Sequence, residues 1–294
     1  MRMMARSIYE MLKATVVGFI EDEALTRGAA ISFYTVTAIA PLLLILVGLA
    51  GLFFGREAAQ SAVIAQLSGL MGPQTADFFQ GILANAAGQT SGVLATIAGF
   101  VTLMLTATGI FGEMQSALNT IWKVETKTTT VSRLLRARAA SLGLVAVLGF
   151  LLVVSLVVSA GLSAFGGYLQ AVLPVGRFVI YALNIAISFL LIAVLFGAIF
   201  KVLPDRRLEW RDVAVAAFAS SLLFSVGKFL IAWYLGTSAI GSTYGAAGAL
   251  ILLLLWVYYS VQILLLGAEF TKAYANTHGS RVANPVTETK VIKL

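Results

Sequence analysis

Residues that could do chemistry are few in this chain and stand far apart. The 294 residues include one histidine, His278, which lies in the tail, and no cysteine. Serine–histidine pairs and histidine-bound metals inside the bilayer are therefore excluded, as are disulfides. There is no H-E-x-x-H motif and no P-loop. The aspartates, at positions 22, 77, 205 and 212, all lie outside or at the ends of the long apolar segments. We therefore predict that the protein is not an enzyme and has no metal or other cofactor.

Six long apolar runs determine where the polar residues lie. A helix of about 20 residues crosses the ~30 Å hydrocarbon core of a bilayer. With 60% hydrophobic and 11% charged residues, the chain has no room for a soluble domain beside these runs. We predict an all-α polytopic membrane protein with six transmembrane helices. The predicted spans are approximately Ile31–Phe54, Gly92–Gly112, Ala139–Ala164, Phe178–Phe200, Val213–Leu235 and Tyr244–Ala268.

The positive charges alternate between the two sides of these spans. The first 30 residues, the second and fourth connections and the tail hold 17 of the 20 lysines and arginines. The opposite side holds two, Arg56 and Arg177, and Lys228 lies inside a run. The positive-inside rule places both termini in the cytoplasm, so we predict a multi-pass inner-membrane protein. The net charge of +7 is explained by this topology and by contact with anionic lipid, so we predict no nucleic-acid partner.

Three further segments flank the spans. Within residues 1–30 we predict an amphipathic cytoplasmic helix at about Met3–Ile20 that lies on the leaflet, followed by a turn at Glu21-Asp22-Glu23. Residues 55–91 are predicted to form two short outward-facing helices broken at Gly72-Pro73. The tail, 269–294, is predicted to be cytoplasmic and disordered.

Lys228 is the candidate contact for a solute or a lipid. It lies about fifteen residues into its span, roughly 23 Å up at about 1.5 Å per residue and about 7 Å below the outer edge of the core. Two interpretations stay open: a lysine that extends to the interface, or a cation in a cavity that pairs with an anionic substrate. At the cytoplasmic ends of the spans, a polar network is predicted from Arg27, Glu113, Asn119 and Glu269.

Proline and glycine mark candidate bends and close contacts. Pro41 is predicted to kink the first span. Small-residue spacing predicts close helix approach at Gly51 and Gly55, and again at the start of the last span. There the glycines are Gly241, Gly245 and Gly248. The alternative is that these three form a flexible gate beside Tyr244, a second candidate substrate or lipid contact.

Five sequence stretches carry a family resemblance. They are STYGAAG at 242–248, WVYYS at 256–260, LLLGAE at 264–269, AAISFYT at 29–35 followed by APLL at 40–43, and LNTIWKV at 118–124. Together they resemble the YihY/BrkB family over about residues 18–274, although Ala38 stands where a serine is expected. The resemblance implies a bacterial inner-membrane protein with six spans. An old ribonuclease BN label attached to the family has no supporting residues in this chain.

Two functional hypotheses follow. The first is transport or translocation of an amphipathic or anionic solute, including lipid, through a bundle with a kinked span and one buried cation. The second is a non-transporting scaffold or envelope-assembly partner that works through its outward helices and its surface-lying N-terminal helix. The expected partners are membrane lipids, an unidentified solute or envelope protein, and in some arrangements a second copy of the chain.

Overall fold

A computed structural model describes residues 2–71, 78–84, 93–124, 176–206, 208–237 and 240–278. Within these ranges the chain is helical and has no strand, as predicted. The seven long helices described are α1 (Arg2–Glu21), α2 (Ala24–Phe54), α3 (Arg56–Met71), α5 (Val93–Ile121), α7 (Gly176–Val202), α8 (Trp210–Thr237) and α9 (Ile240–Thr277). Residues 78–84 form a further short helix.

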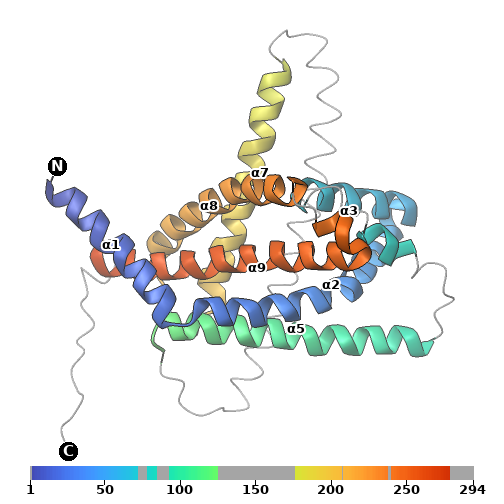
Figure 1. Cartoon of the computed structure of the whole chain (residues 1–294), viewed down its shortest axis with the longest axis horizontal. Helices are drawn as coiled ribbons and strands as arrows, with labels where there is room; N and C mark the ends of the chain where they lie inside the picture. The colour runs from blue at the N-terminus through green and yellow to red at the C-terminus, as the bar shows by residue number, and fades with distance from the viewer. Residues whose placement is uncertain are drawn as a thin grey trace, which may run out of the picture.

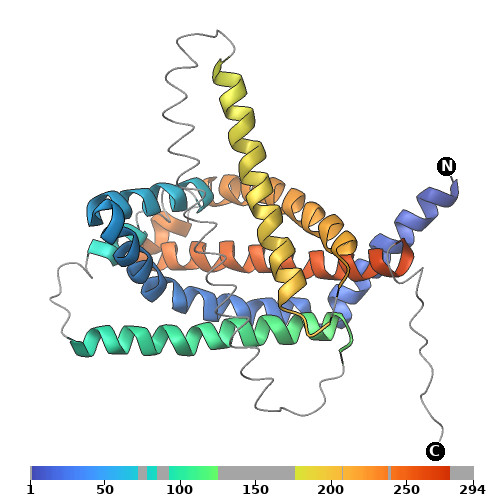
Figure 2. The ribbon, with the colours of Figure 1, turned by 180° about the vertical axis from the view of Figure 1, so that it is seen from behind.

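The longest of these helices, α9, lies at the centre of the arrangement. It packs against α1, α2 and α8 and touches α5, while α2 packs along α5 (Figure 1). The α7 helix packs against α8 but runs steeply across the other helices in both views (Figure 2). We call the end of the bundle that carries α1 the α1 end, and the opposite end, which carries α3, the α3 end.

Many large apolar side chains lie on the outside of the described bundle. Phe33, Leu190 and Phe229 are each more than 60% exposed, whereas small residues such as Ala216 and Ala268 are fully buried where helices meet. Large apolar side chains on the surface need a lipid solvent, and small ones inside allow close helix contact. Four helices among the described residues are long and apolar enough to cross a membrane. They are found at Ala24–Leu52, Ala182–Val202, Trp210–Ile231 and Gly248–Thr277.

These four segments correspond to the first, fourth, fifth and sixth predicted spans. The second predicted span, 92–112, falls on α5, which is helical but is not among the four. The third, 139–164, lies outside the described residues. The chain is therefore a helical membrane protein, and the count of six spans stays a prediction.

Two helices extend beyond the predicted boundaries. The helix that carries the first predicted span starts at Ala24, before Ile31, because α1 ends at Glu21 and a two-residue turn, with Glu23 at a φ of 55°, leads directly into α2. The last helix passes the predicted end at Ala268 and continues to Thr277, so residues 269–277 are helical rather than disordered. Burial of Thr271, Ala273 and Ala275 explains this extension. Residues 279–294 of the predicted tail lie outside the described ranges.

Pro41 and the Gly51/Gly55 pair shape α2. The helix continues through Pro41 and bends along its length in both views (Figures 1 and 2). At its end, Gly55 has a φ of 84°, and its amide donates to the Gly51 carbonyl at 3.0 Å. A methyl group on Gly51 would lie 3.3 Å from the Cα of Arg56. Among the described residues, the close approach at Gly51 is the tight turn from α2 into α3, and contact of this pair with another span stays a prediction.

Candidate functional site

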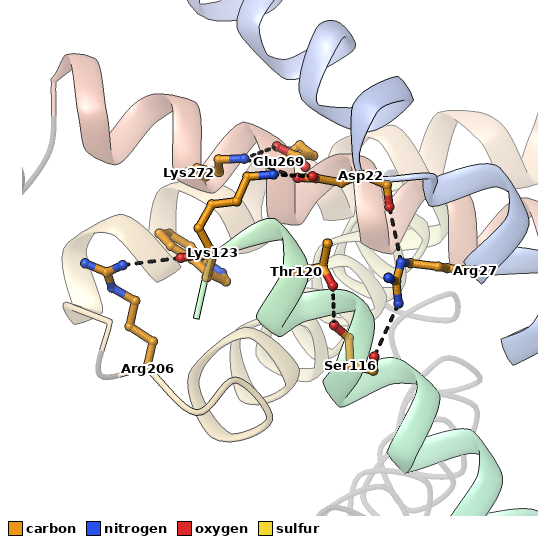
Figure 3. A network of polar contacts seen from close by, with 9 residues as sticks. Asp22, Arg27, Ser116, Thr120, Lys123, Arg206, Glu269 and Lys272 are labelled. Atoms are coloured by element: carbon orange, nitrogen blue, oxygen red, sulfur yellow. Dashed lines mark hydrogen bonds and ion pairs between the residues drawn. The ribbon is translucent and has the colours of Figure 1, made fainter. Parts of the chain in front are cut away.

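A cluster of charged and amide side chains gathers at the α1 end of the bundle (Figure 3). We call it the α1-end cluster. Its members come from the α1–α2 turn, α2, α5 and the turn that follows it, the α7–α8 connection and α9. They are Asp22, Arg27, Glu113, Asn119, Lys123, Asp205, Glu269 and Lys272.

Lys272 lies between two buried carboxylates. Its Nζ is 3.3 Å from Asp22 Oδ2 and 3.3 Å from Glu269 Oε2. The other Asp22 oxygen, Oδ1, pairs with Lys123. The second Glu269 oxygen, Oε1, is buried and has no hydrogen-bond partner among the described residues. Figure 3 shows both lysine side chains directed at Asp22, with Glu269 beside them.

Local sequence brings these groups together. Glu269 and Lys272 are three residues apart on α9, so they share one face of the helix. Gly18 allows α1 to lie directly over the Glu269 carboxylate, because any side chain at position 18 would meet Glu269 Oε2. Burial by itself would raise the pKa of Asp22, but the hydrogen bonds with Lys123 and Glu269 and the charges of Lys272 and Lys123 outweigh it. The pKa of Asp22 therefore lies below its ordinary value of 3.8.

A second set of contacts ties α5 to its neighbours. Arg27 Nη1 lies 3.7 Å from Glu113 Oε1 and 3.3 Å from the Ser116 hydroxyl. Asn119 forms a two-way contact with Asp205: its Nδ2 donates to Oδ2 at 2.9 Å, and its Oδ1 accepts from the Asp205 amide at 2.9 Å. These bonds hold the end of α5 to α2 on one side and to the α7–α8 connection on the other.

All four residues predicted for a polar network lie in this cluster, but they do not form a single connected network with one another. Arg27 pairs with Glu113, Asn119 with Asp205, and Glu269 with Lys272. Sequence reasoning missed the partners that close the cluster, namely Asp22, Lys123, Asp205 and Lys272. The acidic run at 21–23 was a signal for Asp22, which was interpreted only as part of a turn. Nothing in the run itself shows which of its carboxylates is buried.

A cavity of about 410 Å³ lies at the opposite, α3 end. Its wall along α2 is mostly apolar, and the first turns of α3 contribute one cation and one amide. We call this space the α2 groove. Its lining residues are Leu44, Val47, Gly48, Gly51, Leu52, Arg56, Gln60 and Leu83.

A second cavity of about 640 Å³ shares Gln60 with the α2 groove. We call it the α3 cavity. Its walls come from α3 and from the helix at 78–84, and they are mainly polar. Its lining residues are Glu57, Gln60, Ser61, Ile64, Ala65, Ser68 and Gln80. Val63 of α3 and Phe79 and Leu83 of the helix at 78–84 are buried in the core, so both helices pack on the bundle.

The remaining predicted contact residues lie on α8 and at the start of α9. Lys228 is partly buried on α8, and its Nζ lies 5.2 Å from the centroid of the exposed Phe229 ring. It lines neither of the two cavities, and both interpretations of it stay predictions. Gly248 is buried near the start of α9. The side-chain surroundings of Gly241, Tyr244 and Gly245 lie outside the described part, so packing and gating remain alternatives there.

Comparison with known proteins connects these features to a family. A family model described as "Virulence factor BrkB" matches residues 15–290. Curated relatives include several UPF0761 membrane proteins. The one from Rhodospirillum centenum is 26% identical over 89% of this chain and 56% of its own length. That of Janthinobacterium sp. is 30% identical over 86% of this chain and 57% of its own length. That of Mannheimia succiniciproducens is 24% identical over 92% of both chains.

The chain spans little more than half the length of the first of these relatives, and nearly all of the last. No solved structure matches it significantly.

Proposed function

Because this chain belongs to the virulence factor BrkB family of membrane proteins, we propose that it translocates an amphipathic or anionic solute, such as a lipid, across the bacterial inner membrane. The α2 groove is the observation that supports this proposal. It combines a long apolar wall with one cation at its end. An amphipathic anion has the same division between an apolar chain and a charged head.

The apolar wall, the cation and the volume of the α2 groove favour such a solute. Leu44 and Leu52 line the groove while remaining exposed, so an acyl chain can cover them, and each buried methylene contributes about 0.8 kcal/mol. Arg56 is exposed and has no ion-pair partner among the described residues, so its guanidinium is available for a phosphate or carboxylate. The groove volume of about 410 Å³ falls in the range of small-ligand sites, which is about 300–1,000 Å³.

Orientation follows from the charge pattern. We place the α1 end and both termini in the cytoplasm, and the α3 end with the α2 groove at the outer side. The α1-end cluster would then close the cytoplasmic side of the bundle, while the groove opens toward the outer leaflet. A solute that crosses the membrane would have to pass between these two ends.

Proteoliposomes test translocation directly. Purified protein should accelerate the passage of a fluorescent anionic lipid between leaflets, and Arg56→Gln should slow it by removing the cation of the groove. Arg6→Gln, which removes an exposed arginine from α1, is the matched control and should leave the rate unchanged. Equal rates with and without protein, across lipids and other anionic amphipaths, would contradict the proposal.

Lys228→Ala separates the two interpretations of that lysine. If Lys228 is a cation on the solute path, the variant slows translocation as Arg56→Gln does. If Lys228 only extends to the interface over Phe229, translocation continues at the native rate.

A scaffold function is the second candidate, and one observation favours it. The side of α1 that faces away from α9 exposes large apolar side chains, with Tyr9 at 64% and Ile20 at 67% exposure. A protein partner could cover this face. Crosslinking in cells from a photoreactive residue at Leu12 would recover a stoichiometric protein partner if scaffolding is correct, and lipid alone if it is not.

A further inference from the structure

We propose that the α2 groove and the α3 cavity form one site for an anionic lipid whose headgroup carries several hydroxyl groups beyond its phosphate. This inference rests on the proposed function and names the class of its substrate. The acyl chain would lie along α2, the phosphate at Arg56, and the hydroxylated headgroup in the α3 cavity.

The two spaces lie on neighbouring sides of α3 and share one lining residue. Gln60 lines both of them, and Arg56 of the groove precedes Glu57 of the cavity in the chain. Glu57, Ser61 and Ser68 recur at helical spacing, so they present polar groups along one side of α3. Gln80, on the helix at 78–84, contributes to the same cavity. A headgroup bound at Arg56 would need to extend past Gln60 to reach these polar groups.

The type of polar group indicates the type of headgroup. The described lining of the cavity offers two serine hydroxyls, two side-chain amides and one carboxylate, and it includes no lysine or arginine. Hydroxyls and amides both donate and accept hydrogen bonds, and a carboxylate only accepts. Ligand hydroxyl groups also donate and accept, so they fit this set. A second phosphate does not, because Glu57 would repel it and no cation in the cavity would offset that repulsion.

Cavity size separates a hydroxylated headgroup from an ammonium one. An ethanolamine headgroup could pair its ammonium with Glu57, but it is small and would leave the serines and glutamines without contacts. The α3 cavity, at about 640 Å³, is larger than the groove that takes the acyl chain. A ring or chain of several hydroxylated carbons uses both the volume and the dispersed polar groups.

Native mass spectrometry of the full chain in detergent tests this with three lipids. Dioleoylphosphatidylinositol carries a hydroxylated ring, and dioleoylphosphatidylmethanol has the same charge without hydroxyls. Dioleoylphosphatidylethanolamine carries an ammonium. We expect the inositol lipid to bind more tightly than the methanol lipid. Ser61→Ala/Gln80→Ala should remove this difference, with a loss of about threefold to tenfold per lost hydrogen bond for the inositol lipid alone. Both residues are exposed, so the double variant should fold.

The outcomes distinguish this inference from the proposed function. If both anionic lipids bind equally and Arg56→Gln weakens both, the hydroxylated headgroup is wrong while amphipathic-anion binding stands. If the ethanolamine lipid binds most tightly and Glu57→Gln abolishes that binding, the cavity is an ammonium site and the inference is overturned. If no lipid binds above the level of a protein without a groove, lipid as the solute of the proposed function is contradicted as well.

Discussion

Asp22 is the central side chain of the α1-end cluster, because its carboxylate accepts hydrogen bonds from two lysines in different parts of the chain, Lys123 and Lys272. Its side chain is 3% exposed, so its charge is compensated by Lys123 and Lys272 rather than by water. Replacing it removes the group that both lysines share and leaves Lys272 with Glu269 alone. The contact between the α1–α2 turn, α5 and α9 would then lose its central charge.

We predict that Asp22→Asn lowers the stability of the protein by about 1–3 kcal/mol at neutral pH, measured by thermal unfolding in detergent. Because the folded state lowers the pKa of Asp22, its stabilising contribution is present above the ordinary value of 3.8 and is lost as pH falls below it. The difference between native and variant should therefore shrink under acidic conditions. Glu21→Gln, which removes an exposed charge next to Asp22, is the control and should have little effect. A difference that persists unchanged to pH 3 would contradict the ionic account.

Sequence reasoning could place the polar residues at one end of the bundle but could not pair them. Arg27, Glu113, Asn119 and Glu269 all border apolar runs, and this position alone predicts that they lie together. The partner of each depends on how far the helices overlap and how they are rotated about their axes. Asp205, which bonds Asn119 across 86 residues of sequence, lies in a short connection whose position follows from packing rather than from any local motif.

At the scale of elements, the contact between α2 and α5 depends on a glycine. A methyl group on Gly109 would lie 2.8 Å from Cδ1 and 3.0 Å from Cε1 of the Tyr34 ring, closer than real side chains approach. Gly112, one turn later on α5, has open space at the same position. A rigid ring cannot move aside easily, so the two glycines should respond differently to the same change.

We predict that Gly109→Ala costs about 1–3 kcal/mol of stability through overpacking against Tyr34. Gly112→Ala should be neutral or stabilising, because alanine favours a helix over glycine by about 1 kcal/mol. Thermal unfolding of the two variants, side by side, checks this. Adding Tyr34→Ala to Gly109→Ala should recover part of the loss, and equal melting temperatures for both single variants would show that α2 and α5 are not packed this closely.

The sequence predicted helices better than it predicted helix ends. Apolar runs of 20 or more residues identify α2, α7, α8 and α9, because only a helix satisfies its own backbone in hydrocarbon. The ends at Ala24 and Thr277 were missed because tertiary contacts, not hydropathy, hold those turns. Buried Thr271 and Ala275 on α9 illustrate this: their neighbours Lys272 and Asn276 are polar, and only the packing of α1 reveals which side is covered.

At the scale of the whole molecule, the ion pairs and the cavities lie at opposite ends of the bundle. The α1 end holds a dense set of ion pairs between elements, whereas the α3 end holds the α2 groove and the α3 cavity. The alternation of lysine and arginine, from which we predict that the α1 end is cytoplasmic, is independent of these contacts. The steep crossing of α7 was not predictable, because its apolar surface is compatible with many packing angles.

Single cysteines test the orientation, since the native chain contains none. Ala58→Cys, exposed on α3, should react with a membrane-impermeant maleimide in intact cells whose outer membrane has been made permeable. Glu10→Cys, exposed on α1, should react only after the inner membrane is disrupted. Leu190→Cys lies in the candidate span Ala182–Val202 and is 62% exposed, so it should resist the reagent in both conditions if lipid covers it. The reverse pattern for Ala58 and Glu10 would place the α2 groove in the cytoplasm, and the direction of the proposed translocation would have to be inverted.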